Sequence, residues 1–331
     1  MMNNTTDCVL SEPQTIASDL LPPILILEFI LALPGNAVAF WGFCCRQQPW
    51  TSNLVYLVNL MLSDFLLLIG LPLRIDTLLR GEEWIFGDAL CRLNLFMLAI
   101  NRSASIAFMT VITVDRYFKI LYPFHSISQL SARRAVISVC LVWITVILLR
   151  LPLLTTSLLN SQSNDSSKLM CRSFGRNTAP TGEVWLHYML YLLEFLLPFL
   201  LVLFCSVRIY CFLRGHRLRT HRRVRRAMRL VLMVIIVFCI CFLPSVLSVI
   251  ASLALQRLQH CASLLIAGQM FSLSEGLTYL NSALDPIIYG FASPIFRKAL
   301  RASLNFLGPW RTQISQEVAY VSPQTRSQND Q

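Results

Sequence analysis

Charged residues are scarce in this sequence. They make up 14% of its 331 residues, against about 25% in a typical soluble domain, whereas hydrophobic residues make up 55%. The mean hydropathy is accordingly +0.60. A shortage of charge on this scale excludes an ordinary soluble globular protein and indicates that most of the chain lies in lipid.

Acidic residues are the scarcer of the two charge types, and the formal net charge is +11. A protein that binds nucleic acid would also be basic, but here the basic residues are concentrated between two long apolar segments. The run 208–229 contains nine arginines and no acidic residue. Arginine-rich loops of membrane proteins face the cytoplasm. We therefore expect no nucleic-acid partner, and instead a basic surface that faces proteins of the cytosol.

Motifs of several other protein classes are missing. The cysteines do not follow a zinc-site spacing, and neither a G-x-S-G serine with a histidine nor the paired aspartates of an intramembrane protease are present. Internal repeats, which many transporters have, are not visible. We expect no enzyme and no cofactor apart from the cation considered below, with a membrane transporter as a remote alternative.

We expect no cleavable signal at the N-terminus, because the first twenty residues are polar and lack a basic start. Asn3 and Asn4 each begin an N-x-T sequon, and Asn164 begins N-D-S. These sequons predict a glycosylated extracellular N-terminus, residues 1–20, on a protein of the plasma membrane.

Long apolar segments dominate the rest of the chain. A membrane-spanning helix needs about 20 mostly apolar residues. Seven segments qualify, and six of them contain an internal proline, which a membrane bundle tolerates better than a soluble one. We predict an all-α membrane protein with a seven-transmembrane helix bundle over residues 21–291. The segments are 21–44, 53–79, 88–121, 134–158, 186–213, 226–255 and 263–291.

The region after the last span has two parts. The Arg-rich run places the third inner loop in the cytoplasm, so seven crossings leave the N-terminus outside and the C-terminus inside. Residues 293–306 combine apolar and basic side chains in the pattern of a short amphipathic helix that lies on the membrane lipids. Residues 307–331 are polar and predict a disordered cytoplasmic tail.

Ionisable residues inside a bilayer are costly, so each is a candidate functional residue. Cys91 lies at the outer end of the third span. Arg102 follows it by 11 residues and hence lies about 16 Å into the membrane. A guanidinium does not deprotonate in proteins, so Arg102 needs an anion. That anion is either an internal acid, Glu194 or Glu275, or the carboxylate of a ligand.

Arg74 lies on the outer half of the second span and is a second candidate cation for such a ligand. Two arginines with planar donor forks make a good clamp for a carboxylate. Asp76 is the candidate internal partner of Arg74.

Two aspartates lie deep in the predicted bundle. Asp64 is in the middle of the second span and Asp285 is low in the seventh. With Asn36, Ser105 and Asn281 they can line a small wet cavity, whose oxygen atoms suit a hard cation, with Na⁺ at Asp64 as the candidate. The alternative is a structural network of polar groups and water.

Asp115, Arg116 and Tyr117 mark the inner face of the membrane. Asp115 follows Cys91 by 24 residues, about 36 Å along a helix and a full bilayer crossing. An Asp–Arg pair there either locks a resting state until the bundle rearranges, or is a plain charge pair beside the membrane.

A set of motifs occurs in order along the predicted spans: Gly35-Asn36, Asp64 in LSDFLL, Cys91, Asp115-Arg116-Tyr117, Trp143, Pro198, CFLP at 241–244 and NSALDPIIY at 281–289. In these motifs the chain resembles rhodopsin-like G-protein-coupled receptors, over roughly residues 20–306. Three departures occur: Phe242 replaces the usual tryptophan, Asp285 replaces the usual asparagine, and the family's helix-8 cysteine is missing. The first two are familiar variants and do not threaten the fold.

Within this family the chain is most similar to the hydroxycarboxylic acid and oxoeicosanoid receptor group. The runs that carry this similarity are CRLNLFMLAINRSAS (91–105), YLLEFLLP (191–198), CICFLPS (239–245), LTYLNSALDP (277–286) and, for the oxoeicosanoid branch, PWTSN (49–53) and LPLRID (71–76). The resemblance implies that Arg102 anchors a ligand carboxylate and that Arg74 assists it. Leu98, Ser173, Phe174 and Tyr279 would complete the pocket.

The resemblance also bears on the size of the ligand. Receptors for short acids in this group have a further arginine five residues past the proline of the sixth span, where this chain has Val249. A more apolar upper pocket favours an oxidised (oxo or hydroxy) fatty acid. A small hydroxycarboxylic acid such as lactate or hydroxybutyrate is the alternative.

Disulfides, coupling and a switch are also implied by the resemblance. Cys91 should bond Cys171, and the remaining outer cysteines, Cys8 and Cys261, are predicted to pair. The expected cytosolic partner is a heterotrimeric G protein of the Gi class. The expected activation switch comprises Asp115, Arg116, Tyr117, Phe242, Pro244 and Tyr289.

Overall fold

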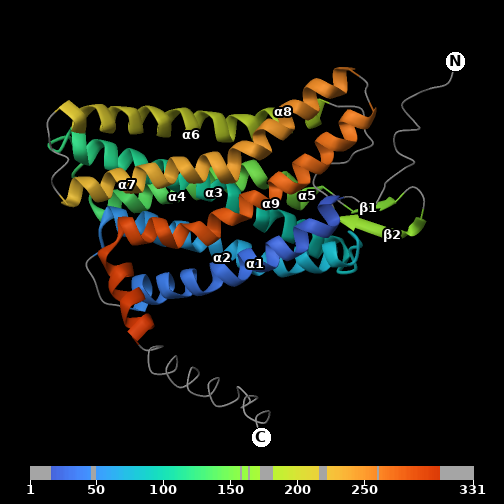
Figure 1. The fold of residues 1–331 in the computed structure, drawn as a ribbon, viewed down its shortest axis with the longest axis horizontal. Coiled ribbons are helices and arrows are strands. Elements are labelled where there is room, and N and C mark those ends of the chain that lie inside the picture. The colour runs from blue at the N-terminus through green and yellow to red at the C-terminus, as the bar shows by residue number, and fades with distance from the viewer. Residues whose placement is uncertain are drawn as a thin grey trace, which may run out of the picture.

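The structure, a computed structural model, describes residues 16–45, 50–156, 159–162, 165–171, 182–215, 222–258 and 261–305. Its long helices lie side by side in one bundle (Figure 1). A further helix covers residues 294–305. The helices in chain order are α1 (Ile16–Phe40), its π-helical continuation η2 (Trp41–Cys45), α2 (Ser52–Leu79), α3 (Gly87–Leu121), α4 (Ala132–Arg150), α5 (Pro152–Thr155), α6 (Gly182–Gly215), α7 (Arg222–Val237), the π-helical η4 (Phe238–Phe242), α8 (Leu243–Leu258) and α9 (Cys261–Ala292).

The bundle is arranged around α3, which contacts α2, α4, α6 and α7. α9 lies against both α1 and α8, so the first and last long helices are neighbours (Figure 1). Within the described residues, six helical stretches are long and apolar enough to cross a membrane; α9 is not among the six, but it runs through the same bundle for 32 residues. The helical membrane bundle predicted from the sequence is confirmed.

The fourth helix is shorter than predicted. α4 ends at Arg150, and α5 begins at Pro152 after the single residue Leu151. Proline has no backbone N–H to donate, so Pro152 cannot continue the backbone hydrogen bonding of α4. Pro152 therefore occupies the first position of a new short helix, where the missing N–H has no consequence. The predicted continuous helix to residue 158 is wrong.

The helix of the sixth span widens directly before Pro244. In a regular α-helix a proline ring collides with the carbonyl four residues earlier, which here belongs to Ile240 in η4. The wider π-turn relieves this collision, and the N–H of Leu243 donates to the carbonyl of Phe238. Phe238 and Phe242 are both fully buried, with their rings 5.6 Å apart edge to face.

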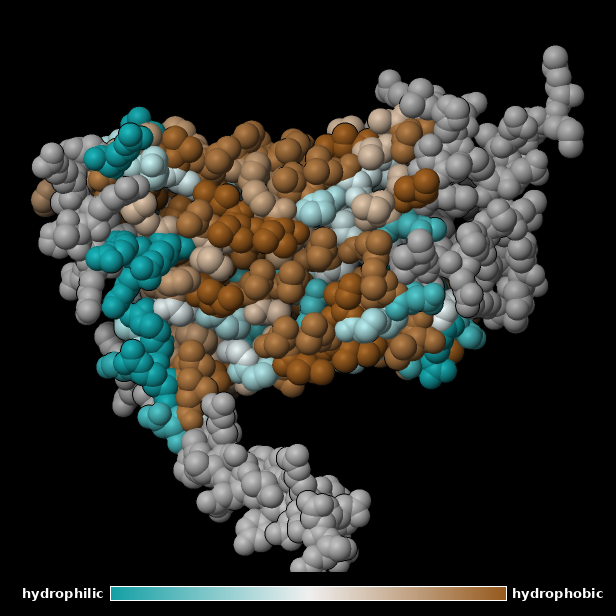
Figure 2. All heavy atoms as spheres, in the orientation of Figure 1, coloured by the Kyte–Doolittle hydropathy of each residue, from teal (hydrophilic) through white to brown (hydrophobic). Residues whose placement is uncertain are grey.

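The outside of the bundle is apolar. Figure 2 shows hydrophobic side chains over its middle and hydrophilic residues gathered toward the ends. Leu148 and Leu197 are each 62% exposed, whereas Asp64, Arg102 and Asn281 are buried. Leucines outside and charges inside suit a bundle surrounded by lipid, because lipid cannot solvate the charges. The protein is therefore a multi-pass membrane protein.

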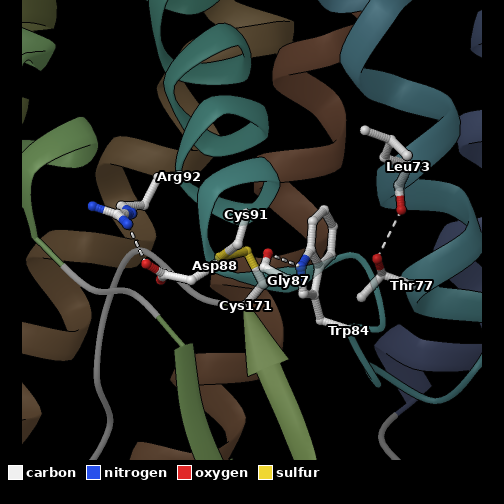
Figure 3. The surroundings of a disulfide bond; sticks show 8 residues. All are labelled: Leu73, Thr77, Trp84, Gly87, Asp88, Cys91, Arg92 and Cys171. Carbon is white, nitrogen blue, oxygen red and sulfur yellow. Dashed lines mark hydrogen bonds and ion pairs between the residues drawn. A yellow bond between two sulfur atoms is a disulfide. The ribbon is translucent and has the colours of Figure 1, made fainter.

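One end of the bundle, called the hairpin end, carries strands β1 (Leu159–Gln162) and β2 (Asp165–Cys171), which pair antiparallel. Cys171 forms a disulfide with Cys91 in the first turns of α3 (Figure 3). The backbone N–H of Trp84 donates to Leu169 at 2.8 Å, and its indole N–H donates to Gly87 at 2.7 Å. The predicted Cys91–Cys171 disulfide is confirmed, and it restrains the hairpin over the end of the bundle.

At the opposite end, helix 294–305 turns away from α9 and packs on η2. The Phe296 ring lies 6.3 Å from Phe43 and 5.7 Å from Tyr289. A side chain at Gly42 would meet the methyl group of Ala299 at 2.8 Å. This contact holds the helix beside the end of the first span that lies away from the hairpin end.

α1 and α9 approach each other closely at Gly35. A Cβ atom at this position would lie 2.4 Å from Cγ and 3.0 Å from Cβ of Pro286. The proline ring is closed onto its own backbone and cannot rotate away. The neighbouring Asn36 side chain donates to the carbonyl of Ser282 across the same contact at 3.0 Å. A glycine is thus required for this packing.

Gly35→Ala should destabilise the protein, because an overpacked core position costs about 1–3 kcal/mol. We expect a lower unfolding temperature for the detergent-solubilised protein, measured by size-exclusion chromatography after heating. Gly290→Ala is the matched control: Gly290 is a helical glycine of α9, the helix that Gly35 packs against, and an added Cβ there would meet nothing within 4 Å. Its unfolding temperature should stay the same or rise slightly. Equal stability of the two variants would contradict the close contact.

Candidate ligand-binding site

A small cavity of about 50 Å³ lies inside the bundle. Side chains from α3, α4, α5, α6 and α9 line it, and its surface is mostly apolar with a few polar groups, as is usual for small-molecule sites. The polar lining residues are Arg102, Arg150, Tyr191, Glu275, Thr278 and Tyr279.

Arg102 lines this cavity and is only 6% exposed. Its Nη1 donates to Oε2 of Glu194 at 3.4 Å, and its guanidinium lies 3.8 Å from the centre of the Tyr191 ring. Its Nε and Nη2 donate to no acceptor in the described part of the chain. Of its two predicted internal partners, Arg102 thus contacts Glu194 over a long distance. Two of its N–H groups remain without an acceptor among the described residues.

Arg150, at the end of α4, is a second buried arginine in the cavity and was not predicted. It forms the closer ion pair with Oε2 of Glu194, and its Nε donates to Ser103 at 2.9 Å. The rule that singles out ionisable residues in a span would have found it, since Arg150 lies within the predicted fourth segment. Its partner on α6 could not be read from the sequence.

Arg74 does not line the cavity, and its predicted partner is wrong. Asp76 pairs instead with Arg80, at 2.8 Å and near the surface. Residues four apart share a face of a helix, whereas residues two apart do not. Arg74 and Arg102 both interact electrostatically with Glu275 on α9. Glu275 thus lies within electrostatic reach of the two arginines that the sequence singled out.

Of the other predicted pocket residues, Leu98 and Tyr279 line the cavity and pack in one apolar cluster. Ser173 and Phe174 lie outside the described residues, as do the sequons at Asn3, Asn4 and Asn164. The predicted Cys8–Cys261 pair also lies outside them, because Cys8 and the side chain of Cys261 are not described.

Asp64 is fully buried in the middle of a polar network. Its Oδ1 accepts from the Ser282 hydroxyl at 2.7 Å and its Oδ2 from the Tyr289 hydroxyl at 2.6 Å. It also shares a hydrogen bond with Asp285, whose Oδ2 accepts from Asn281 at 3.2 Å. Four of these residues were singled out from the sequence, as part of either the cation site or the switch, and Ser282 was not.

The oxygens near Asp64 fit a hard cation. Oδ1 of Asn281 and of Asp285 accepts no hydrogen bond in the described structure, and neither does Oδ1 of Asn36 or of Asn101. Asn36 and Asn101 are joined to the network because their amides donate to Ser282. Carboxylate and amide oxygens are ligands that hard cations prefer.

Ser105, the other predicted cation ligand, contacts Ser63 rather than Asp64. Their hydroxyl oxygens lie 3.2 Å apart. Among the described residues, no three His, Cys, Asp or Glu side chains come together. A cation at Asp64 would thus depend on two carboxyl groups supplemented by neutral oxygens.

Asp115 is buried near the C-terminal end of α3 and has two cationic neighbours. Lys119 lies closer, at 2.8 Å, and Arg116 lies at 3.6 Å. Arg116 also donates to the Asn53 side chain on α2. The predicted Asp115–Arg116 pair is thus present, but Asp115 also forms an ion pair with Lys119.

This architecture, a helix bundle with an internal cavity and a disulfide-tied hairpin at one end, is that of the multi-pass helical receptors. A model of the family described as 7 transmembrane receptor (rhodopsin family) matches residues 35–289. The chain therefore belongs to the rhodopsin family of G-protein-coupled receptors, which bind a ligand and act on a G protein.

Several curated relatives match most of the chain. The human oxoeicosanoid receptor 1 is 42% identical over 306 residues, which cover 92% of this chain and 78% of that protein. The mouse hydroxycarboxylic acid receptor 1 is 43% identical, covering 92% and 88%. The human hydroxycarboxylic acid receptor 2 is 41% identical, covering 86% and 77%. All three are receptors by name, and the resemblance to this group is confirmed.

Proposed function

We propose that this protein is a plasma-membrane receptor whose ligand binds through a carboxylate to Arg102. The observation that carries the proposal is a buried guanidinium that lines a cavity and has two donor groups without acceptors. A planar fork of this kind suits a carboxylate. The names of the relatives, which refer to oxoeicosanoids and hydroxycarboxylic acids, support the same chemistry. The hairpin end would face outward.

We propose an oxidised fatty acid as the ligand class. Val249, where short-acid receptors have arginine, is buried with the apolar core of the bundle. An apolar residue at this position suits the acyl chain of a ligand better than an arginine would. A long chain would have to extend beyond the cavity or widen it.

A small hydroxycarboxylic acid is the second candidate, and the cavity volume favours it. About 50 Å³ is enough for only a few heavy atoms, since one water molecule occupies about 30 Å³ of liquid. The two candidates are separated by dose–response curves for an oxo-eicosanoid and for lactate on cells that express the chain. A response to lactate alone would overturn the fatty-acid proposal.

Arg102→Ala should nearly abolish the response to the active acid, because truncating one partner of a buried charge pair costs about 3–5 kcal/mol, or at least two decades of affinity. Arg102→Lys should rescue only partly, since an ammonium lacks the bidentate fork. The methyl ester of the agonist should fail on the wild type.

Surface expression is the control for Arg102→Ala. An N-terminal epitope tag detected on unpermeabilised cells measures expression and also tests the proposed outside N-terminus. If Arg102→Ala expresses poorly, and Glu194→Gln in the same chain restores both expression and agonist potency, then Arg102 is structural and the ligand anchor lies elsewhere.

We also propose that the Asp115–Arg116 pair locks the resting state, and that Tyr117, Phe242, Pro244 and Tyr289 change their contacts on activation. We further propose that the receptor couples to Gi. Support comes from the buried Asp115 with its two cationic neighbours and from the Arg-rich inner loop. The π-turn at Phe242 and the Tyr289–Asp64 hydrogen bond supply contacts that a rearrangement would break.

Asp115→Asn should raise basal signalling, because it removes the negative charge that holds Arg116. We expect a lower cyclic AMP level without agonist, restored by pertussis toxin. Lys119→Gln, which leaves the Asp115–Arg116 pair intact, is the control and should change basal activity less. A surface-expressed Asp115→Asn with unchanged basal activity would refute the lock, and a toxin-resistant signal would refute Gi coupling.

We propose that Na⁺ binds at Asp64, with Asp285, Asn281 and Ser105 as further candidate oxygen ligands. A bound cation would offset the charge of two carboxyl groups in contact. Agonist affinity should depend on Na⁺ concentration in wild-type membranes, with choline as the control cation, and Asp64→Asn should remove this dependence. Equal Na⁺ sensitivity in the variant would show that the network is purely structural.

A further inference from the structure

Arg150 has no role in the function proposed above, although it lines the same cavity and is only 7% exposed. A guanidinium in this position must be paired, because lipid and apolar side chains do not solvate it. Its partners are Glu194 and the hydroxyl of Ser103. The question is why the cavity contains a second arginine at all.

Glu194 is shared unequally between the two arginines. One carboxylate oxygen, Oε2, accepts from both, but the pair with Arg150 is the closer one and the contact with Arg102 is 3.4 Å long. The other oxygen, Oε1, accepts no hydrogen bond among the described residues. The geometry therefore assigns most of the Glu194 charge to Arg150.

The charged side chains near the cavity form two groups among the described residues. Arg102 and Arg150 face Glu194, whereas Arg74 interacts electrostatically with Glu275 and Glu82. Without Arg150, Glu194 would pair with Arg102 alone, and a ligand carboxylate would have to compete with Glu194 for Arg102.

We propose that Arg150 is a positioning residue that holds the Glu194 carboxylate and so keeps Arg102 available for a monocarboxylate ligand. The inference rests on the proposed function, because it assumes that Arg102 is the anchor. Like-charge contacts in a binding site reduce affinity strongly. The role of Arg150 is therefore to remove a competing anion rather than to contact the ligand.

A double-mutant cycle tests this role, with an oxo-eicosanoid and lactate as probes. Arg150→Met should lower agonist potency by at least about tenfold, because Glu194 then neutralises Arg102. Glu194→Gln alone should not lower potency, because it removes the competitor. The variant with both changes should return to within about threefold of the wild type, since neither the competitor nor its partner remains.

Arg92→Met is the matched control. Arg92 also lies on a helix near the hairpin end, where it pairs with Asp88 and donates to the carbonyl of Leu154 (Figure 3 shows the pair). It does not line the cavity, so losing its charge should leave potency within about threefold of the wild type. A tenfold loss here would mean that any arginine removed at this end lowers potency, and would overturn the inference.

A purely structural role for Arg150 makes a different forecast. Arg150→Met would then reduce surface expression while the molecules that reach the surface keep wild-type potency, which would refute the proposal. If Arg150→Met does not reach the surface, the variant with both changes decides, because removing both partners of a buried pair is often tolerated. Wild-type potency in that variant supports the inference, and a tenfold loss overturns it.

Failure of the inference is distinguishable from failure of the proposed function. If Arg102→Ala keeps a full response, or neither probe activates the wild type, the anchor proposal fails and this inference fails with it. If Arg102→Ala abolishes the response but Glu194→Gln does not rescue Arg150→Met, only the role of Arg150 is refuted.

Discussion

Lipid offers no hydrogen bonds, so each polar group inside the bundle depends on a partner within the protein or on a bound ligand. The bundle meets this constraint with contacts between helices that are far apart in sequence. The Trp143 indole donates to Asn59 across α4 and α2 at 2.8 Å, and Asp64 accepts from two hydroxyl groups of α9. These contacts set how each helix is rotated, and the rotation then decides which side chains face lipid.

Unpaired polar atoms are informative for the same reason. Many of those in the described residues belong to two places: the cavity, at Arg102 and Glu194, and the network around Asp64. An unpaired buried polar atom destabilises a protein by about 1–3 kcal/mol, and more when it is charged. These are the two places where the proposed ligand carboxylate and the proposed cation would bind.

The intramembrane-charge rule located these two places from the sequence because a charged residue in an apolar run is visible without a structure. Arg102, Glu194, Glu275, Asp64 and Asp285 were all found in this way. The same rule did not assign partners. It paired Arg74 with Asp76, which in fact faces Arg80, because partners depend on helix rotation rather than on proximity in the chain. Arg150 was overlooked, and with it the ion pair that competes for Glu194.

The sequence by itself determined the lipid environment and the presence of long apolar spans, and it located charged residues within them, because hydropathy is a local property. It also carried the family motifs. Only the tertiary structure decided that Glu194 lies closer to Arg150 than to Arg102, that α4 breaks at Pro152, and that Tyr289 reaches Asp64. Those outcomes depend on how helices pack against each other, and packing is settled by contacts between residues that the sequence places far apart.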